Sequence, residues 1–213
     1  IPDRVDEGYG INSDALSRLA AEGVRLVITV DCGIRSPDEV AHGRRCGLDL
    51  IVTDHHHLGE SLPDALACIN PRRPDSRYPF RDLAGVGVAY KLAQALLRAE
   101  RAAPCAPAPV ELEESDLLDL VALGTVADLV PLVGENRALV AQGLRRLNQP
   151  RRVGLQALLF EAGLKQGKVL STNIAFALAP RLNAAGRLDS AMLSYDLMTA
   201  TIAGTASRLA HQL

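Results

Sequence analysis

The sequence of 213 residues contains no tryptophan, and aromatic side chains make up only 3% of it. Hydrophobic residues nevertheless account for 48%, so the core must be built from Leu, Val, Ile and Ala. No apolar run reaches the roughly 18 residues that a membrane-spanning helix requires, and no signal peptide opens the chain. We therefore expect a globular protein without a membrane segment.

A surplus of either charge is also missing, because 23 Lys and Arg side chains face 25 Asp and Glu, for a formal net charge of −2. Nucleic-acid-binding proteins usually carry a basic surplus, so composition alone does not indicate one. A carboxylate-rich metal site would, however, lower the net charge. Divalent ions bound in such a site would restore positive potential where a phosphate binds.

Cysteine is scarce and unpaired in sequence. The four residues, Cys32, Cys46, Cys68 and Cys105, form no CxxC pair, which argues against a zinc site built on thiolates. Few cysteines without a framework pattern are typical of a reducing compartment, so we expect a cytoplasmic protein.

Two short β-branched runs predict neighbouring parallel strands. RLVITV at 25–30 reads as a buried strand, and DLIVT at 49–53 reads as a second one. Between them, Ser36 and Pro37 mark the start of a helix, and residues 66–69 predict a short third strand. The pattern is a βαβ unit, so the fold class is α/β, a parallel sheet flanked by helices, followed by a mainly helical portion.

The chain divides into three predicted segments. Residues 1–101 form the α/β portion, 102–114 an Ala/Pro-rich loop, and 115–213 a helical portion. The first residue is Ile and the last lies in a helical pattern, so we expect a fragment of a longer protein. The apolar periodicity places helices at 116–132, 135–148, 153–163, 172–179 and 189–200.

Polar residues follow both predicted strands directly. Asp31 comes after the first strand, and Asp54, His55 and His56 come after the second. Ligands of open α/β sheets gather outside the carboxyl ends of the strands, so these groups should lie together. Carboxylate and imidazole suit Mn²⁺ or a similar divalent ion. Alternatively, a single Asp at this position forms a turn or caps a helix, and the histidines belong to a solvated loop.

Asp128 is a third candidate, because it interrupts the apolar stretch ALGTVADLVPL at 122–132. A carboxylate at the carboxyl end of a helix is disfavoured by the helix dipole, which favours a metal-ligand role. The alternative is a solvent-facing Asp in the last turn of the helix.

These motifs together resemble the DHH phosphoesterase family. ITVDCG at 28–33, VTDHH at 52–56 and ALGTVADLVPL at 122–132 look like its second, third and fourth motifs. The stretches between and around them resemble the RecJ branch, the single-strand-specific 5′→3′ exonucleases of bacteria. They are EGYGIN at 7–12, NPRR at 70–73, LAGVGVAYKL at 83–92 and APRLNAAGRLDSA at 179–191.

The resemblance implies roles for individual residues. Asp31 matches an Asp that bridges two metal ions, Mn²⁺ or Mg²⁺, while His55 and Asp128 match ligands of one of them. His56 matches the second His, beside the scissile phosphate, and Asp54 would support the histidines. The extra residue His57 has no assigned role.

The resemblance is incomplete. The family's first motif, with its paired aspartates, and its C-terminal substrate-binding domain have no counterpart in the sequence. The second metal site should therefore lack ligands, and we expect this chain to bind metal weakly and to be nearly inactive.

Arginines outside these motifs are candidates for contacts to nucleic acid. Arg72 and Arg73 lie in a Pro-rich loop and could hold backbone phosphates, although a solvated loop is an equal alternative. Arg181, Asn183 and Arg187 carry the polar groups of PRLNAAGR; the arginines could instead pair with acidic residues.

The resemblance thus implies a metal-dependent hydrolase that degrades single-stranded DNA from the 5′ end to mononucleotides in DNA repair and recombination. It would be a monomer of the bacterial cytoplasm that works with a single-strand-binding protein and a helicase. Two alternatives stay open. One is a DHH phosphoesterase for oligoribonucleotides, cyclic dinucleotides or pyrophosphate, and the other is a non-catalytic scaffold.

Overall fold

The computed structural model describes residues 10–105, 111–188 and 191–213. The chain separates into two compact units, Tyr9–Glu111 and a second unit that contains Leu112–Leu213. The boundary between them lies within the segment 102–114 that the composition marks as a linker.

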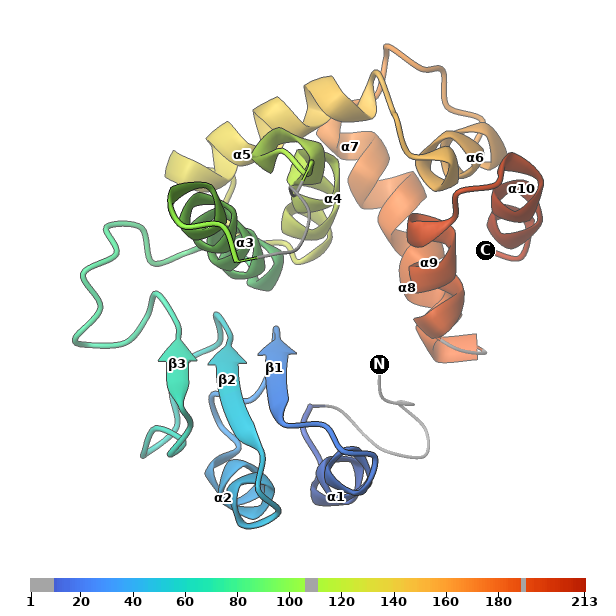
Figure 1. Cartoon of the computed structure of the whole chain (residues 1–213). Helices are drawn as coiled ribbons and strands as arrows, with labels where there is room; N and C mark the ends of the chain where they lie inside the picture. The colour runs from blue at the N-terminus through green and yellow to red at the C-terminus, as the bar shows by residue number, and fades with distance from the viewer. Residues whose placement is uncertain (1–9, 106–110, 189–190) are drawn as a thin grey trace. The chain divides into compact units, whose positions relative to one another are not determined.

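The Tyr9–Glu111 unit is built on a parallel three-stranded sheet in the order β1-β2-β3 (Figure 1). Val30 of β1 is paired with Thr53 of β2, and Thr53 with Ile69 of β3, so the carboxyl ends of all three strands reach one edge. Helix α2 packs on β2, α1 packs on α2, and α3 contacts β1 and β2. The elements are α1 (Ser13–Ala21), β1 (Leu26–Val30), α2 (Pro37–Arg45), β2 (Asp49–Thr53), β3 (Ala67–Ile69) and α3 (Gly85–Ala102).

Local signals account for the two helices that flank the strands. Asn12 caps α1, since its side-chain oxygen accepts a hydrogen bond from the Ala15 N–H at 2.7 Å. Ser36 occupies the N-cap of α2 and Pro37 its first turn, as predicted, although the Ser36 side chain makes no capping bond. The start of α2 therefore depends on the fixed φ of Pro37 rather than on a side-chain cap.

The prediction that both strands are buried is correct for β2 and wrong for β1. Leu50 and Val52 of β2 are fully buried and pack with Ile34 of the loop between β1 and α2. In β1, by contrast, Leu26 and Val30 are 48% and 53% exposed. The exposed residues alternate along β1, so one face of this edge strand is exposed among the described residues.

The second unit is helical in its described residues, and its core is formed by leucines such as Leu147, Leu155 and Leu178. Helices α4 and α5 pack closely because residue 143 is a glycine: a Cβ there would overlap the Leu118 carbonyl oxygen. The elements are η1 (Glu114–Leu117), α4 (Leu118–Ala127), α5 (Gly134–Leu147), α6 (Val153–Glu161), α7 (Ser171–Asn173), η2 (Ile174–Leu178), α8 (Ala179–Leu188), α9 (Ala191–Thr199) and α10 (Ala203–His211).

The helix predicted to end at residue 179 continues through α8. The intervening η2 is a π-helical turn, in which the Ala179 N–H donates to the Ile174 carbonyl. Pro180 has no N–H, and its ring would clash with the carbonyl four residues earlier. A π turn widens the backbone there, so the helix passes Pro180 instead of ending before it.

The two halves of the fold class are thus confirmed: a parallel sheet flanked by helices, followed by a helical portion. Among the described residues, no helix combines the length and the apolar character that crossing a membrane requires.

The α4–α5 contact predicts opposite effects for two Gly→Ala changes. Gly143→Ala should lower the free energy of unfolding by about 1–3 kcal/mol, because the new Cβ would force the helices apart. Gly204→Ala in α10, where nothing lies within 4 Å of the new Cβ, should raise it by up to about 1 kcal/mol. Urea unfolding followed by circular dichroism measures both; equal effects would contradict the packing argument.

Candidate metal centre

Hydrogen bonds between two threonines join the carboxyl ends of β1 and β2. The Thr53 hydroxyl donates to the Thr29 carbonyl at 2.6 Å, and the Thr53 N–H donates to the Thr29 hydroxyl oxygen at 3.3 Å. The Thr29 hydroxyl in turn donates to the Cys32 carbonyl at 2.8 Å. The residues that follow the two strands therefore start from fixed positions.

Asp31 leaves β1 in a left-handed conformation, with φ of 64°. Its N–H still donates to the Thr53 carbonyl at 3.0 Å, so the backbone turns only after the last sheet bond. Left-handed residues other than glycine are uncommon, and Asp and Asn tolerate the conformation best. The turn holds the Asp31 carboxylate at the carboxyl edge of the sheet.

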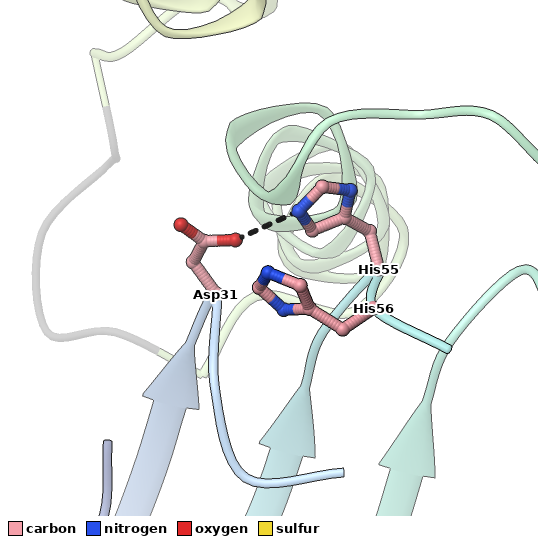
Figure 2. Close-up of side chains that lie close together, drawn as sticks. All are labelled: Asp31, His55 and His56. Carbon is pink, nitrogen blue, oxygen red and sulfur yellow. Dashed lines mark ion pairs between the residues drawn. The ribbon is translucent and has the colours of Figure 1, made fainter. Parts of the chain in front are cut away.

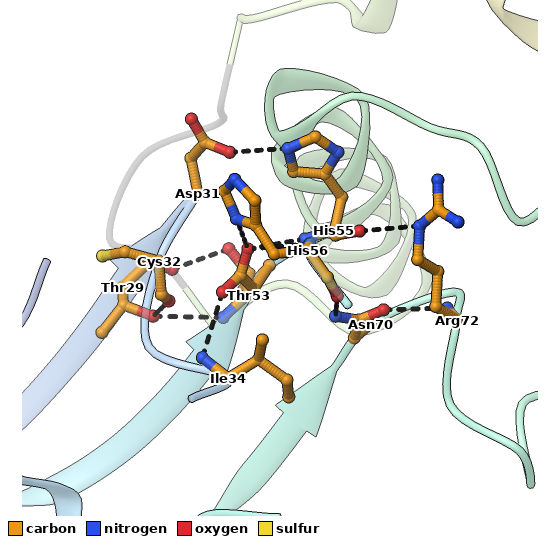
Figure 3. A network of polar contacts seen from close by, with 10 residues as sticks. Thr29, Asp31, Cys32, Ile34, Thr53, His55, His56, Asn70 and Arg72 are labelled. Atoms are coloured by element: carbon orange, nitrogen blue, oxygen red, sulfur yellow. Dashed lines mark hydrogen bonds and ion pairs between the residues drawn. The ribbon is translucent and has the colours of Figure 1, made fainter. Parts of the chain in front are cut away.

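Asp54 organises the loop after β2. Its side chain is 2% exposed and accepts four hydrogen bonds. Oδ2 accepts from the Ile34 N–H at 3.0 Å, while Oδ1 accepts from the N–H groups of His55 and His56 at 2.8 and 3.2 Å. The fourth partner is Nδ1 of His56, 2.7 Å from Oδ1 (Figure 3). One buried carboxylate thus fixes both histidines and the loop before α2.

These hydrogen bonds also set the charge of Asp54. Burial by itself raises the pKa of the carboxyl, but donation from Ile34, His56 and His55 outweighs it and leaves the pKa below its usual value. Asp54 is therefore ionised at neutral pH. When Nδ1 of His56 donates to it, the lone pair of Nε2 stays available to a ligand.

Asp31, His55 and His56 come together at the carboxyl ends of β1 and β2 (Figure 2). Nε2 of His55 lies 3.1 Å from Oδ1 of Asp31, and each of the three residues offers a donor atom within 4.8 Å of the others. The His55 side chain is 9% exposed and that of His56 44%, so the cluster reaches the surface on one side. The expectation that the strand order brings Asp31 and the histidines together is confirmed.

The donor set fits a divalent ion that prefers oxygen and nitrogen. Two imidazoles and a carboxylate suit Mn²⁺ or a similar ion. Cys32, next to Asp31, does not change this, because burial and the charges of Asp54 and Asp31 raise the pKa of its thiol to about 11. The thiol is neutral at physiological pH, so it offers no thiolate to a softer metal.

Helix α3 approaches Asp31 so closely that residue 85 has no space for a side chain. A Cβ on Gly85 would overlap Oδ1 of Asp31. Gly85 opens α3, so the amino end of this helix lies beside the carboxylate, a favourable position for a negative charge. The glycine therefore permits a close approach of helix and carboxylate that no other residue would allow.

The carbonyl groups of both histidines are held from the end of β3 (Figure 3). Nδ2 of Asn70 donates to the His56 carbonyl and Nε of Arg72 to the His55 carbonyl, each at 3.0 Å. Asn70 Oδ1 accepts from the Arg72 N–H at 2.8 Å, and Asp82 accepts from Nη2 of Arg72 at 3.0 Å. Asn70 and Asp82 were not among the predicted site residues.

The other predicted residues have different environments. Arg73 forms an ion pair with Asp75 at 2.6 Å and also donates to the Cys68 carbonyl. In α8, Arg181 donates to the Ala177 carbonyl at 2.9 Å, beside the π turn, and Asn183 is exposed. The side chain of Arg187 lies outside the described residues.

Asp128 belongs to the second unit, so its position relative to Asp31 stays a prediction. Within its own unit it is the C-cap residue of α4, and it is exposed. The next residue, Leu129, has a left-handed φ of 58° and is 85% exposed. Non-glycine residues in this conformation cluster at functional sites.

The arrangement defines an α/β protein with a cluster of carboxylate and imidazole groups, suited to a metal ion, at the carboxyl edge of a parallel sheet. A profile described as "DHH family, N-terminal domain" matches residues 1–125, more than half of the chain, and the chain belongs to this family.

Curated relatives of the chain include two bacterial proteins, each named "Single-stranded-DNA-specific exonuclease RecJ". The protein from Bacillus subtilis (strain 168) is 44% identical over 213 residues, which are all of this chain and 25% of that protein. The protein from Escherichia coli (strain K12) is 43% identical over 224 residues, covering all of this chain and 37% of that protein. The chain therefore spans between 25% and 37% of the length of these two relatives.

Solved structures give the same relationship. A crystal structure of exonuclease RecJ bound to manganese matches all of this chain and 51% of its own, with a TM-score of 0.82 and 37% identity. RecJ from Thermus thermophilus in complex with Mn²⁺ matches 95% of this chain and 29% of its own, with a TM-score of 0.77 and 36% identity.

The role of Asp54 predicts a pH-dependent loss of stability. Its folded pKa is lowered, so its contribution is complete above the unfolded value of about 3.9 and disappears as the pH falls through the folded value. Asp54→Asn should lower the free energy of unfolding at pH 7 by about 2–4 kcal/mol, because the donors lose a charged acceptor.

Urea unfolding at pH 7, 5 and 3 tests this, and the difference from wild type should shrink at pH 3. The control is Asp49→Asn, an exposed residue of β2, which should change little at any of these pH values. An Asp54→Asn deficit that is equally large at all three pH values would show that shape rather than charge matters.

Proposed function

We propose that this chain is part of a RecJ-like exonuclease that hydrolyses phosphodiester bonds of single-stranded DNA from the 5′ end to mononucleotides, using Mn²⁺ or Mg²⁺. The observation that carries the proposal is the cluster of Asp31, His55 and His56 in a chain 44% identical along its whole length to a named single-strand-specific exonuclease. Residues from two separate sequence motifs lie together in the fold, which a chance resemblance of sequence would not produce.

The proposed ligands are Asp31, bridging two ions, and His55 and Asp128. Bound divalent ions would supply positive charge that polarises the phosphate and lowers the pKa of water. His55 offers Nε2 beside the Asp31 carboxylate, 3.1 Å away, in a nearly buried position. Support for Asp128 comes from its DHH-family motif and from the left-handed residue that follows it.

His56 is proposed to contact the scissile phosphate. Its Nδ1 is fixed by ionised Asp54 at 2.7 Å, which leaves Nε2 directed away from that hydrogen bond. From that position the imidazole could stabilise negative charge that develops on a phosphoryl oxygen. Asp54 would thus orient His56 without touching the substrate.

The two arginines of the NPRR segment divide between these functions. Arg72 holds the His55 carbonyl and Asp82 through Nε and Nη2, so we assign it to positioning the histidine first and to phosphate contact second. Arg73, Arg181, Asn183 and Arg187 remain proposed contacts to DNA. In the cell the protein would act in DNA repair and recombination as a cytoplasmic monomer, with a single-strand-binding protein and a helicase.

A chimera tests the proposed activity. Replacing the matching segment of the Bacillus subtilis RecJ by this chain, which aligns over 213 residues, should preserve Mn²⁺-dependent release of mononucleotides from 5′-labelled single-stranded DNA. The same chimera with Asp31→Asn should be inactive but folded by circular dichroism. Cleavage of only pyrophosphate or dinucleotides by the folded chimera would instead support another DHH phosphoesterase.

Metal affinity tests the donor set directly in this chain. Asp31→Asn and His55→Gln should each weaken Mn²⁺ binding by about tenfold or more, because each removes a ligand from a set of few. The loss of the free-Mn²⁺ electron paramagnetic resonance signal on titration measures the affinity. Asp49→Asn and His57→Gln, both exposed, are matched controls that should bind Mn²⁺ like wild type. An equal loss of Mn²⁺ affinity in all four variants would contradict the proposed metal site.

Gly85→Ala tests whether the approach of α3 holds the Asp31 carboxylate in place. The added Cβ would overlap Oδ1 of Asp31, so either the carboxylate or the helix must move. We expect Mn²⁺ affinity to fall by about tenfold, as for the loss of a group that orients a ligand. Gly59→Ala, whose new Cβ would have no neighbour closer than 3.9 Å, is the control; wild-type affinity in Gly85→Ala would mean that the contact is not needed.

A further inference from the structure

A cavity of about 360 Å³ lies beside the metal centre in the Tyr9–Glu111 unit. It is formed by the end of β3, the loop that follows it and the first turns of α3, elements that can be followed in Figure 1. Its volume is within the range of pockets that bind small molecules, about 300–1,000 Å³. None of the residues that line it belongs to the Asp31–His55–His56 cluster.

The walls of the cavity are mostly apolar. Leu83, which precedes α3, and Val88 of α3 line the cavity and are 1% and 2% exposed. Ile69 contributes from β3, and Tyr78 adds an aromatic ring from the loop. A flat, largely apolar ligand would match this lining, because aromatic side chains stack on nucleobases irrespective of their sequence.

The charged residues of the lining carry a net positive charge. Arg73 and Lys91 are cationic, and Asp75 is the one carboxylate among the lining residues. Asp75 forms its ion pair with Arg73, at 2.6 Å, at one side of the cavity, and Lys91 contributes from α3. A ligand with an anionic group next to its flat part would complement this excess of cations.

The cavity shares its structure with the metal centre at two points. Asn70 lines the cavity, and its side-chain amide donates to the His56 carbonyl at 3.0 Å. Leu83 and Val88 flank Gly85, which lies against the Asp31 carboxylate. A ligand in the cavity would therefore lie beside the groups that hold both sides of the centre.

We propose that this cavity binds a nucleoside monophosphate, with the base against Tyr78, Leu83 and Val88 and the phosphate toward Lys91. The inference rests on the proposed function, in which nucleotides are both part of the substrate and the product. A base and a phosphate joined by a sugar are the flat and anionic parts that the lining requires. The cavity would then hold one nucleotide next to the place of cleavage.

Ligand binding without metal tests the proposal, because EDTA removes any binding of phosphate through ions at the centre. Isothermal titration of this chain with dAMP, deoxyadenosine and inorganic phosphate should show that dAMP binds tightest. Lys91→Gln should weaken dAMP binding by about fivefold to tenfold, as expected for a lost charge-assisted contact, and leave deoxyadenosine unchanged. Tyr78→Ala should weaken both, and Lys165→Gln, an exposed lysine of the second unit, neither.

A measurement on the unchanged chain keeps the test valid if a variant fails to fold. Methyl resonances of Ile69, Leu83 and Val88 should shift when dAMP is added, whereas those of Leu155 and Leu158 in the second unit should not. Absence of dAMP binding at millimolar concentration, or shifts confined to other methyl groups, would overturn the proposal. If dAMP does not bind but Mn²⁺ binding still depends on Asp31, the cavity proposal fails and the proposed function stands. If dAMP binds but Mn²⁺ binding does not depend on Asp31, the proposed function fails and the cavity proposal stands.

Discussion

The buried carboxylate of Asp54 is the interaction on which the site depends. An ionised group that is 2% exposed is costly unless its oxygens are fully hydrogen-bonded. Here three backbone N–H groups and one imidazole supply those bonds, and they come from the two histidines and from Ile34. Ile34 is itself 0% exposed in the core, so the conformation of the metal loop is tied to the packing of the sheet.

The parts of the fold that follow from local patterns could be predicted from the sequence. The β-branched runs at 25–30 and 49–53 contain β1 and β2, and Pro37 begins α2 as expected. Exposure of β1 could not be predicted, because an apolar run does not say which strand lies at the edge. Helix α8 was missed for a different reason: Pro180 is normally a stop signal, and the π turn that accommodates it depends on the neighbouring residues.

The same distinction applies to the site. Asp31, His55 and His56 were predictable as a cluster, since the carboxyl ends of adjacent parallel strands must meet. Asn70 and Asp82 were not, because they act on backbone carbonyls and on Arg72 through contacts that no spacing encodes. A guanidinium in a loop reads as a phosphate ligand, whereas Arg72 is largely engaged by protein oxygens. Asp128 depends on how the two units are arranged, which motif order alone does not give.

Two features around Asp31 reduce the local stability of the fold at the carboxyl edge of the sheet. Its left-handed φ is less costly for Asp or Asn than for other side chains, and the contact with Gly85 excludes any residue with a Cβ from the start of α3. Glycine at a helix start is itself a weak helix former. Both features reduce stability, yet together they place one carboxylate 3.1 Å from a nearly buried imidazole. Glycine would adopt the backbone conformation of position 31 at lower cost, so the backbone alone does not account for a carboxylate there.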